Sequence, residues 1–368
     1  MSDRIRNVSV IVTVGILFFA HSLLSWFGGD KAYSQSERRP LAQFPKLSAK
    51  QVAQGEFLEE FEDYSADQFP MREELRAVKA ASSFALFGRL DNNGLYQREG
   101  YLSMLEYPLK PAMISHAATR FQWINDNYLR EAGIRPYFAI VPDKNYFLAK
   151  KYGYPALDYG GLTEEMKARL DGFSYIDIFP CLSLEDYYRT DTHWRQECIQ
   201  DVARRIASEM GVSLSAQYDR RTLTQPFYGV YAGQMGLPAK PDQLCYLTND
   251  ILEKCTVTSF DNGKPEKKTV YDMEKAEGKD PYDLFLGGAD PLVMIENPSA
   301  STDRELVIFR DSFGSSLAPL LAEGYRKMTL VDIRYIQSSM IGEFIHFDKQ
   351  DVLFLYSTLV LNSSTGLK

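Results

Sequence analysis

The stretch Glu305-Leu-Val-Ile-Phe-Arg-Asp-Ser-Phe-Gly-Ser-Ser316 decides the fold of this 368-residue chain. Its first five residues are typical of a strand buried on both faces, and Asp311-Ser-Phe-Gly314 follows where the next helix should begin. In open parallel sheets, ligands bind outside the carboxyl ends of the strands. The stretch therefore predicts a turn that exposes the Ser312 hydroxyl, beside N–H groups that can receive a developing oxyanion. On this stretch alone, a helix cap at Asp311 or Ser312 explains the pattern as well as a nucleophile does.

Strands and helices alternate around this stretch. Further strands are predicted at residues 136–141, 175–179, 327–333 and 351–360, and helices at 111–131, 163–171, 195–210, 315–323 and 335–344. This alternation implies an α/β fold with a mostly parallel sheet covered on both faces. Upstream, residues 48–88 have apolar residues at helical spacing and predict two helices broken at Pro70, and Tyr96 and Tyr101 lie in a predicted hairpin.

The first 28 residues indicate a membrane segment. Arg4 and Arg6 precede a run from Val8 to Phe27 without acidic or basic residues. About 20 apolar residues are enough to cross a bilayer. The basic flank should stay in the cytoplasm, so the chain after Gly28 should lie outside. The alternative is a cleaved signal peptide, whose apolar core is usually shorter, and the intact mass of the mature protein would distinguish the two.

Composition excludes some classes of function. A net charge of −8 argues against a nucleic-acid partner, which needs clustered positive charge. We find no phosphate-binding glycine loop, nicotinamide fingerprint or zinc spacing, so no cofactor and no metal are expected. The cysteines could form disulfides outside the cell, although the sequence does not give their pairing and a free thiol at Cys198 fits equally well. They are Cys181, Cys198, Cys245 and Cys255.

A second segment, Asp191-Thr-His-Trp194, supplies what a serine nucleophile needs. The base that accepts the serine proton would be His193, and Asp191 would orient that base and stabilise its charged form. The alternative for a lone histidine is a capping or core role. An acid two residues away and a matching serine at a strand end favour the catalytic interpretation of Asp191, His193 and Ser312.

The Asp191–Trp194 segment resembles the signature of the DHHW family, and with Asp311-Ser-Phe313 the chain is similar to the alginate O-acetyltransferase group of SGNH-like proteins. Further segments look like family landmarks along nearly the whole chain: residues 37–42, 67–72, 141–144, 286–288 and 332–335. Thr192 stands where the family name has its first histidine. Arg310 stands where many SGNH proteins have glycine, a departure that bears on how the serine turn is packed and on the details of the oxyanion site.

The resemblance implies an SGNH-hydrolase-like fold, with a flavodoxin-like parallel sheet in circularly permuted order. It implies a triad of Ser312, His193 and Asp191 that transfers acetyl groups to an exported polysaccharide, with a membrane-bound acyltransferase as the acetyl donor. The expected organisation is a membrane anchor at 1–28, a linker and helical lead-in at 29–95, and the catalytic domain at 96–368.

Four further residues are weaker candidates for substrate or oxyanion contacts. Arg334 and Lys144 follow strands that end at the same edge as the serine strand, and a surface salt bridge is the alternative for Arg334. Gly288 would let the backbone approach a substrate, although a plain turn explains it better. Thr358 lies near the end of the last strand, where SGNH proteins often place a polar oxyanion residue.

Two other functions use the same residues. Water in place of the sugar would make the protein a carbohydrate acetylesterase, and the partition of acetyl groups between glycan and free acetate distinguishes the two. A non-catalytic glycan-binding or assembly protein on the same scaffold is the third, and it would leave Ser312 unreactive toward serine-directed reagents.

Overall fold

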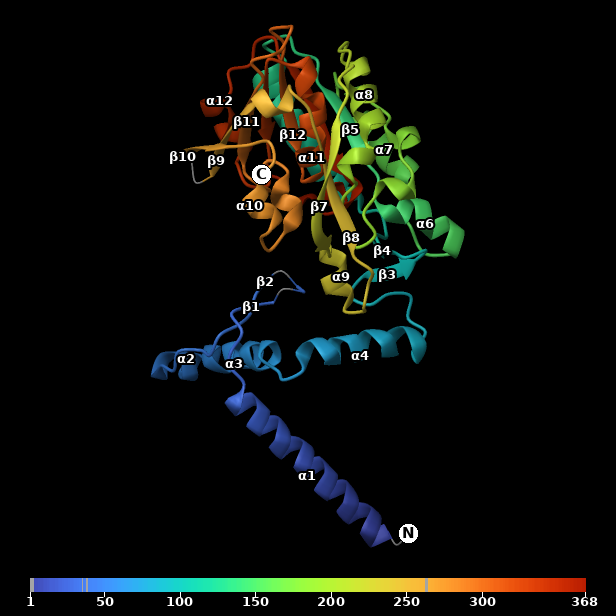
Figure 1. The fold of residues 1–368 in the computed structure, drawn as a ribbon, viewed down its shortest axis with the longest axis vertical. Coiled ribbons are helices and arrows are strands. Elements are labelled where there is room, and N and C mark those ends of the chain that lie inside the picture. Colours follow the sequence, from blue (N-terminus) through green and yellow to red (C-terminus); the bar gives the residue numbers. More distant parts are fainter. Residues whose placement is uncertain (1–2, 35, 38, 262–263) are drawn as a thin grey trace. The chain divides into compact units, whose positions relative to one another are not determined.

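The computed structural model describes residues 3–34, 36–37, 39–261 and 264–368. It divides into two compact units (Figure 1). Unit 1 is Met1–Asn92 with Gly233–Pro238, and unit 2 is Asn93–Ala232 with Ala239–Lys368. Residues 233–238 lie within the sequence range of unit 2 but belong to unit 1. The sequence did not indicate this assignment.

Unit 1 begins with the apolar helix α1 (Asp3–Phe27), which is long and apolar enough to cross a membrane, judged by length and composition. Two short strands, β1 (Tyr33–Ser34) and β2 (Arg39–Pro40), pair next. Three helices follow rather than the predicted two: α2 (Ala49–Gln54), α3 (Glu56–Asp67) and α4 (Arg72–Ala85). The break near Pro70 is confirmed. The additional break lies at Gly55, whose φ of 82° favours glycine.

Unit 2 is built on an eight-stranded sheet with the order β10-β9-β11-β13-β12-β14-β5-β6. Five neighbouring strands are parallel: β13 (Lys327–Val331), β12 (Glu305–Arg310), β14 (Asp351–Ser357), β5 (Tyr137–Val141) and β6 (Ser174–Tyr175). At the other edge, three strands add antiparallel: β11 (Leu292–Glu296), β9 (Thr256–Asp261) and β10 (Lys264–Lys268). The predicted parallel sheet is confirmed for five strands, and the antiparallel extension was not anticipated.

The order of the parallel strands reveals the topology. We number β12, β13, β14, β5 and β6 from 1 to 5. In space these strands then follow the order 2-1-3-4-5, which is the flavodoxin-like order. In this chain, however, the last two strands of that count come first. The predicted flavodoxin-like sheet in circularly permuted order is therefore confirmed.

Helices cover both faces of the parallel sheet (Figure 1). Along β12, Leu306 and Ile308 belong to one buried cluster, while Val307 and Phe309 belong to another. The first cluster includes α8 (Gln200–Glu209) and α11 (Phe313–Leu321), and the second includes α5 (Pro111–Ile124) and α7 (Tyr159–Arg169). This alternation of side chains is what a strand buried on both faces requires.

Several predicted elements end earlier than expected. The strand predicted at 351–360 stops at Ser357, because the Ser357 hydroxyl accepts the Val360 N–H and starts α13 (Thr358–Leu361). Strand β6 has only two residues, and residues 335–344 contain a 3-10 turn and the single turn α12 (Ile341–Phe344). Helix α6 (Lys144–Tyr152) was not predicted. All four cysteines are free thiols.

Two hairpins complete unit 2. The predicted hairpin near Tyr96 and Tyr101 is formed by β3 (Leu95–Arg98) and β4 (Tyr101–Met104). Strands β7 (Asp219–Phe227) and β8 (Asp242–Thr248) form the other. The second hairpin brings Asp242 to the segment that carries His193, as described next.

Candidate active site

The turn after β12 frees the Ser312 hydroxyl. Asp311 occupies the capping role, since its carboxylate accepts N–H groups from Phe313 at 3.0 Å and from Ser357 at 2.7 Å. These bonds join the end of β12 to the end of β14. Ser312 itself makes no side-chain cap to α11. The helix-cap interpretation therefore applies to Asp311, and the Ser312 side chain is available for another partner.

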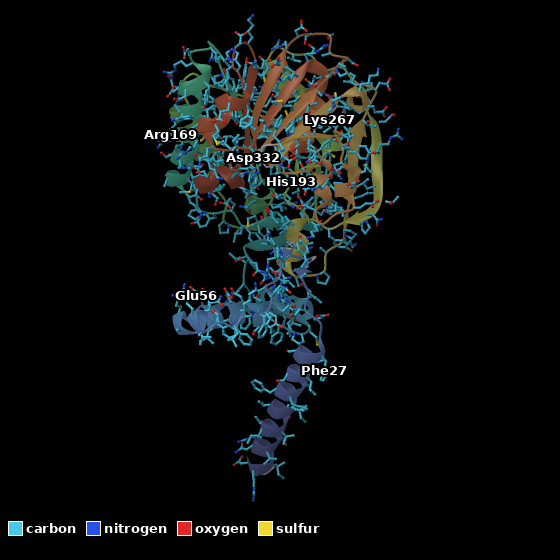
Figure 2. The ribbon with its side chains drawn as sticks, turned by 90° about the vertical axis from the view of Figure 1, so that its left-hand side faces the viewer. Phe27, Glu56, Arg169, His193, Lys267 and Asp332 are labelled. Atoms are coloured by element: carbon cyan, nitrogen blue, oxygen red, sulfur yellow. The ribbon has the colours of Figure 1, made fainter. Side chains whose placement is uncertain are left out.

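That partner is His193. The Nε2 atom of His193 lies 2.7 Å from the Ser312 Oγ, and its Nδ1 atom lies 2.6 Å from Asp191 Oδ1. Both distances are within hydrogen-bond range for a nucleophile, a base and an orienting acid. Asp191 and His193 are both buried, and Figure 2 labels His193 among the side chains of unit 2. The structure thus brings together the three residues that the sequence selected, which lie up to 121 positions apart, from 191 to 312.

Asp191 is held by backbone as well as by the imidazole. Its carboxylate accepts the backbone N–H of His193 at 3.1 Å and that of Val230 at 2.9 Å. Gly229 packs against it so closely that a Cβ there would lie 2.3 Å from the Asp191 Cβ. Only glycine fits so close to Asp191. The contacts of Asp191 with Gly229 and Val230 were not identified from the sequence.

The position of Ser312 in the sheet is the one at which such folds bind ligands. In the flavodoxin-like count, β12 is the first strand and β14 the third, so the chain reverses direction across the sheet between them. Ligands bind in the crevice at this switch point, outside the carboxyl ends of the strands. Ser312 follows β12 directly, and the bonds of Asp311 to β14 fix the turn there.

Comparison with solved structures identifies the fold. A DHHW family protein from Eubacterium siraeum is 20% identical, with a TM-score of 0.61 over 75% of this chain and 95% of its own. The chain has the fold of a DHHW family protein. Bacillus cereus PatB1 with a sulfonyl adduct is 19% identical, with a TM-score of 0.58 over 73% of this chain and 95% of its own. No protein-family model and no curated protein sequence matches the chain.

In this DHHW fold, Lys144 differs from its predicted role. It does not face outward toward a substrate but is buried beneath the Asp191 loop. Its ammonium donates to three carbonyl oxygens, those of Tyr188 at 2.9 Å, Arg189 at 3.3 Å and Asp191 at 2.6 Å. Burial lowers the pKa of Lys144 to about 7, while the carboxylates of Asp191 and Asp242 act in the opposite direction. Lys144 is therefore a positioning residue for the loop.

Asp242 of β8 supports the same loop from another side. Its carboxylate accepts the backbone N–H groups of Arg189 at 2.9 Å and Thr190 at 2.7 Å. The Thr190 hydroxyl also donates to it at 2.6 Å. Two polar side chains, those of Lys144 and Asp242, thus fix the carbonyl and N–H groups just before His193.

The imidazole of His193 packs flat against an aromatic ring. The ring of Tyr282 lies 3.8 Å from it, centroid to centroid, with an interplanar angle of 5°. The Tyr282 hydroxyl lies 2.8 Å from Ser316 Oγ, which also accepts the Trp194 indole N–H at 2.9 Å. Burial raises the pKa of the Tyr282 hydroxyl well above its ordinary value, so it remains protonated. The sequence carries no signal for Tyr282, because its role depends on packing alone.

The other three weaker candidates make no hydrogen bond to the triad among the described residues. Arg334 forms an ion pair with Asp332, with 2.6 Å between Nη2 and Oδ2, so the salt-bridge alternative describes it. Gly288 has a φ of 100°, and a Cβ there would lie 2.5 Å from the Asp283 Oδ1. Thr358 begins α13 and is fully buried, and its hydroxyl has no partner in the described ranges of the chain.

Arg310 is the last residue of β12, directly before Asp311 and Ser312. Its side chain is fully buried, and its guanidinium donates to the Gly288 carbonyl at 3.4 Å and lies 3.9 Å from Asp332. The arginine thus runs behind the serine turn toward β13. Within the described part of the chain, no group of three or more histidine, cysteine, aspartate or glutamate residues could hold a metal ion.

Proposed function

We propose that this protein is a membrane-tethered serine O-acetyltransferase that acts outside the cytoplasm on an exported polysaccharide. The observation that carries the proposal is the continuous hydrogen-bonded series from Asp191 through His193 to Ser312, with distances of 2.6 and 2.7 Å. The length of the apolar helix α1 and the basic residues Arg4 and Arg6 before it support a single span with the rest of the chain outside.

In the first half-reaction, the Ser312 oxygen attacks the carbonyl carbon of an acetyl donor while its proton passes to His193 Nε2. Asp191 accepts the hydrogen bond from Nδ1 and stabilises the imidazolium that forms. Collapse of the tetrahedral intermediate breaks the bond to the donor's leaving group, which takes the proton from His193. The product is an acetyl ester on Ser312.

In the second half-reaction, a sugar hydroxyl replaces the leaving group. His193 Nε2 removes its proton, the sugar oxygen attacks the acetyl-serine, and the proton returns to Ser312 as the ester bond breaks. Negative charge develops on the carbonyl oxygen in both steps. Helix α11 begins beside Ser312, so its positive end lies where this charge needs stabilisation. The acetyl donor would be a membrane-bound acyltransferase.

The proposal is tested on the full chain in detergent micelles, with 4-nitrophenyl acetate as donor and soluble oligosaccharides as acceptors. We expect Ser312→Ala to lower the rate of acetyl transfer roughly 10³-fold or more. The matched control is Ser315→Ala, because Ser315 is buried in the same turn and its hydroxyl has no partner among the described residues. Full activity in Ser312→Ala would refute the assignment.

The products separate this function from its two alternatives. Acetylated oligosaccharide supports the transferase, whereas free acetate alone indicates an acetylesterase. Bacillus cereus PatB1, which shares the fold, is known with a sulfonyl adduct, so a sulfonyl fluoride is a suitable reagent for Ser312. Absence of both labelling and turnover would favour a glycan-binding or assembly protein.

A further inference from the structure

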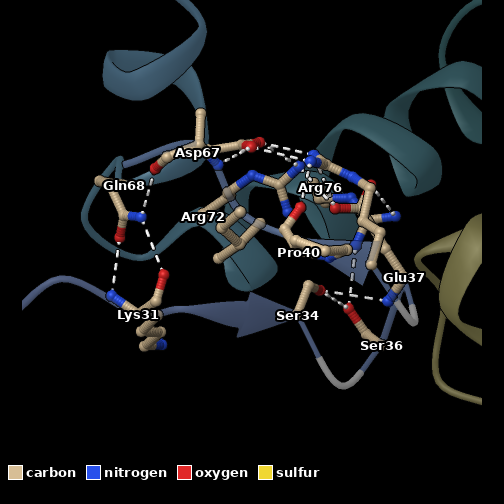
Figure 3. A network of polar contacts seen from close by, with 12 residues as sticks. Lys31, Ser34, Ser36, Glu37, Pro40, Asp67, Gln68, Arg72 and Arg76 are labelled. Carbon is tan, nitrogen blue, oxygen red and sulfur yellow. Dashed lines mark hydrogen bonds and ion pairs between the residues drawn. The ribbon is translucent and has the colours of Figure 1, made fainter. Parts of the chain in front are cut away.

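Two sequence segments that the triad does not use meet in unit 1. Glu37, Arg39 and Ala42 meet Asp67 and Arg72 in one network of ion pairs and hydrogen bonds, in the region that Figure 3 shows. Arg39 donates to Asp67 at 2.7 Å, and Arg72 lies 2.7 Å from Glu37. The Asp67 carboxylate also accepts the backbone N–H of Ala42 at 2.8 Å. The network fastens the segment after β1 to the end of α3 and the start of α4.

A second set of bonds holds α3 close to the end of α1. The Lys31 backbone N–H donates to Gln68 Oε1 and the Gln68 amide donates back to the Lys31 carbonyl, both at 2.9 Å (Figure 3). The Tyr64 hydroxyl donates to Asp30 at 2.9 Å. Three residues lie between Phe27 and Lys31, so Lys31 lies within about 14 Å of the end of the apolar helix, and its bonds to Gln68 hold the end of α3 beside it. The interfacial layer of a bilayer is roughly 5–8 Å thick on each side, so this short tether keeps the end of α3 close to that layer.

Helix α4 has an apolar side that is exposed and does not pack within unit 1. At about 100° per residue, Leu75, Val78 and Leu86 lie on one side of the helix, and they are 47%, 61% and 77% exposed. The opposite side is the one that packs within unit 1. There Ala80 is buried, and Arg76 donates to the Gly233 carbonyl at 2.7 Å. The exposed side is therefore not required to hold this unit together.

Helix α3 has no buried residue, and its Leu58 is 67% exposed. Phe61 remains 40% exposed although its ring contacts those of Phe44, Phe57 and Tyr64. A cavity of about 730 Å³ lies at this level of unit 1. Residues that line it include Leu24 near the end of α1, Lys31 and Met71. The protein thus leaves apolar side chains and unfilled space where the chain leaves the apolar helix.

We infer that α3 and α4 lie in the interfacial layer of the membrane that α1 crosses, with Phe61, Leu75 and Val78 against the acyl chains. This inference rests on the proposed membrane anchor. Lipid is the occupant that chain connectivity provides, since α3 is fastened within a few residues of the span. The first turn of α3 contains Glu56 and Glu59, so burial of apolar surface and not attraction to anionic lipid drives the contact. Neutral phosphatidylcholine is therefore sufficient.

The test uses the full chain in phosphatidylcholine nanodiscs. The noncanonical residue p-acetylphenylalanine, coupled to a nitroxide, is placed one position at a time at Phe61, Leu75 and Val78. Collision rates with oxygen, which partitions into lipid, and with a water-soluble nickel complex then report the environment of each label. The matched control is Glu59, about 160° around α3 from Phe61. A label at Ile11 in the middle of α1 reports whether the span itself is inserted.

We expect the oxygen-to-nickel collision ratio at Phe61, Leu75 and Val78 to exceed that at Glu59 several-fold and to approach the ratio at Ile11. A lipid signal at Ile11 with water-exposed labels on α3 and α4 would overturn this inference and leave the anchor intact. Labels shielded from both reagents would also overturn it, because protein rather than lipid would then cover the surface. A water signal at Ile11 would overturn the anchor and this inference together.

Discussion

The proposed chemistry depends on where the protons of Ser312 and His193 lie. His193 can accept the Ser312 proton at Nε2 only when its own proton sits on Nδ1, facing Asp191. The carboxylate enforces this arrangement because it can only accept. It is itself fixed by two backbone N–H groups, from His193 and Val230. A change at Asp191 should therefore act through the tautomer of the imidazole while leaving the fold in place.

We predict that Asp191→Asn lowers kcat for acetyl transfer by roughly 10³ to 10⁴. The amide can donate to Nδ1, which stabilises the tautomer whose Nε2 carries the proton and cannot act as a base. The measurement is steady-state kinetics with 4-nitrophenyl acetate, accompanied by thermal unfolding to verify the fold. Asp201→Asn is the control, since Asp201 pairs with Arg204 on the surface of α8. A decrease below tenfold at Asp191 would contradict the assigned role.

Tyr282 offers a test of positioning at the base itself. We expect Tyr282→Leu to reduce kcat roughly 10²-fold, because the ring that holds the imidazole plane is lost and the base is misplaced. Tyr282→Phe retains the stacked ring and loses only the bond to Ser316, so its kcat should change at most a few-fold. Equal losses in the two variants would show that the hydroxyl, and not the ring, matters.

The sequence predicted residues that the structure brings within hydrogen-bond distance, and it missed the direction of others. Ser312 and His193 could be paired because each proposed role requires a particular residue type at a strand end or on an adjoining loop. Lys144 was also selected because it follows the end of a parallel strand. Such a position predicts the edge of the sheet at which a residue lies, but not the direction in which its side chain points. Tyr282 and Gly229 could not be found, since stacking and close approach arise only when distant segments pack.

At the scale of elements, apolar runs located the parallel strands well, because such runs are required where both faces are buried. The antiparallel edge was missed, since β9 and β10 form part of a region that lacks this signature. Helix α6 was missed because Pro142-Asp143 marks the end of β5 and also directly precedes the helix, at which Asp143 is the N-cap residue. One short segment thus ends a strand and begins a helix, and the sequence indicated only the first.

The cap residue of α6 should make stability depend on pH. Asp143 is buried and accepts the Tyr159 hydroxyl at 2.5 Å. Burial raises the pKa of its carboxyl to about 7, against the opposing effect of that bond. The unfolded value is near 3.9, so between about pH 4 and pH 7 the folded state binds more protons than the unfolded state. The free energy of unfolding should therefore fall as the pH rises through this window.

We predict that Asp143→Asn removes this part of the pH dependence, because the amide does not titrate and can still accept from Tyr159. Urea unfolding of both proteins between about pH 4.5 and 7 measures it, and the difference in unfolding free energy should shift in favour of the variant as the pH rises. Asp126→Asn serves as the control, since Asp126 is exposed on the surface. Parallel pH profiles for wild type and Asp143→Asn would contradict a raised pKa.

At the scale of the whole molecule, the apolar core belongs to unit 2. In the part of the chain that the structure describes, the four clusters of buried apolar residues consist of residues between 96 and 367, whereas α2 and α3 bury no residue. Unit 1 is held instead by ion pairs and hydrogen bonds such as those of Asp67. Since burial of apolar surface is the main stabilising contribution to folding, unit 2 should not require unit 1 to fold. On the proposed function, the candidate site lies in unit 2 and the proposed membrane helix in unit 1.

We therefore expect a chain that begins at Asn93 to fold and to remain in solution. It retains Asp191, His193 and Ser312 with their supports, although residues 233–238 lose their partners in unit 1, including the bond from Arg76 to the Gly233 carbonyl. Its kcat/KM for 4-nitrophenyl acetate should lie within a few-fold of the full chain, and circular dichroism should show a cooperative unfolding transition. The control is the same chain with Ser312→Ala, which should unfold alike and lack activity. A fragment that aggregates, or that folds but has lost ester cleavage, would show that residues 1–92 contribute to the core or to the site.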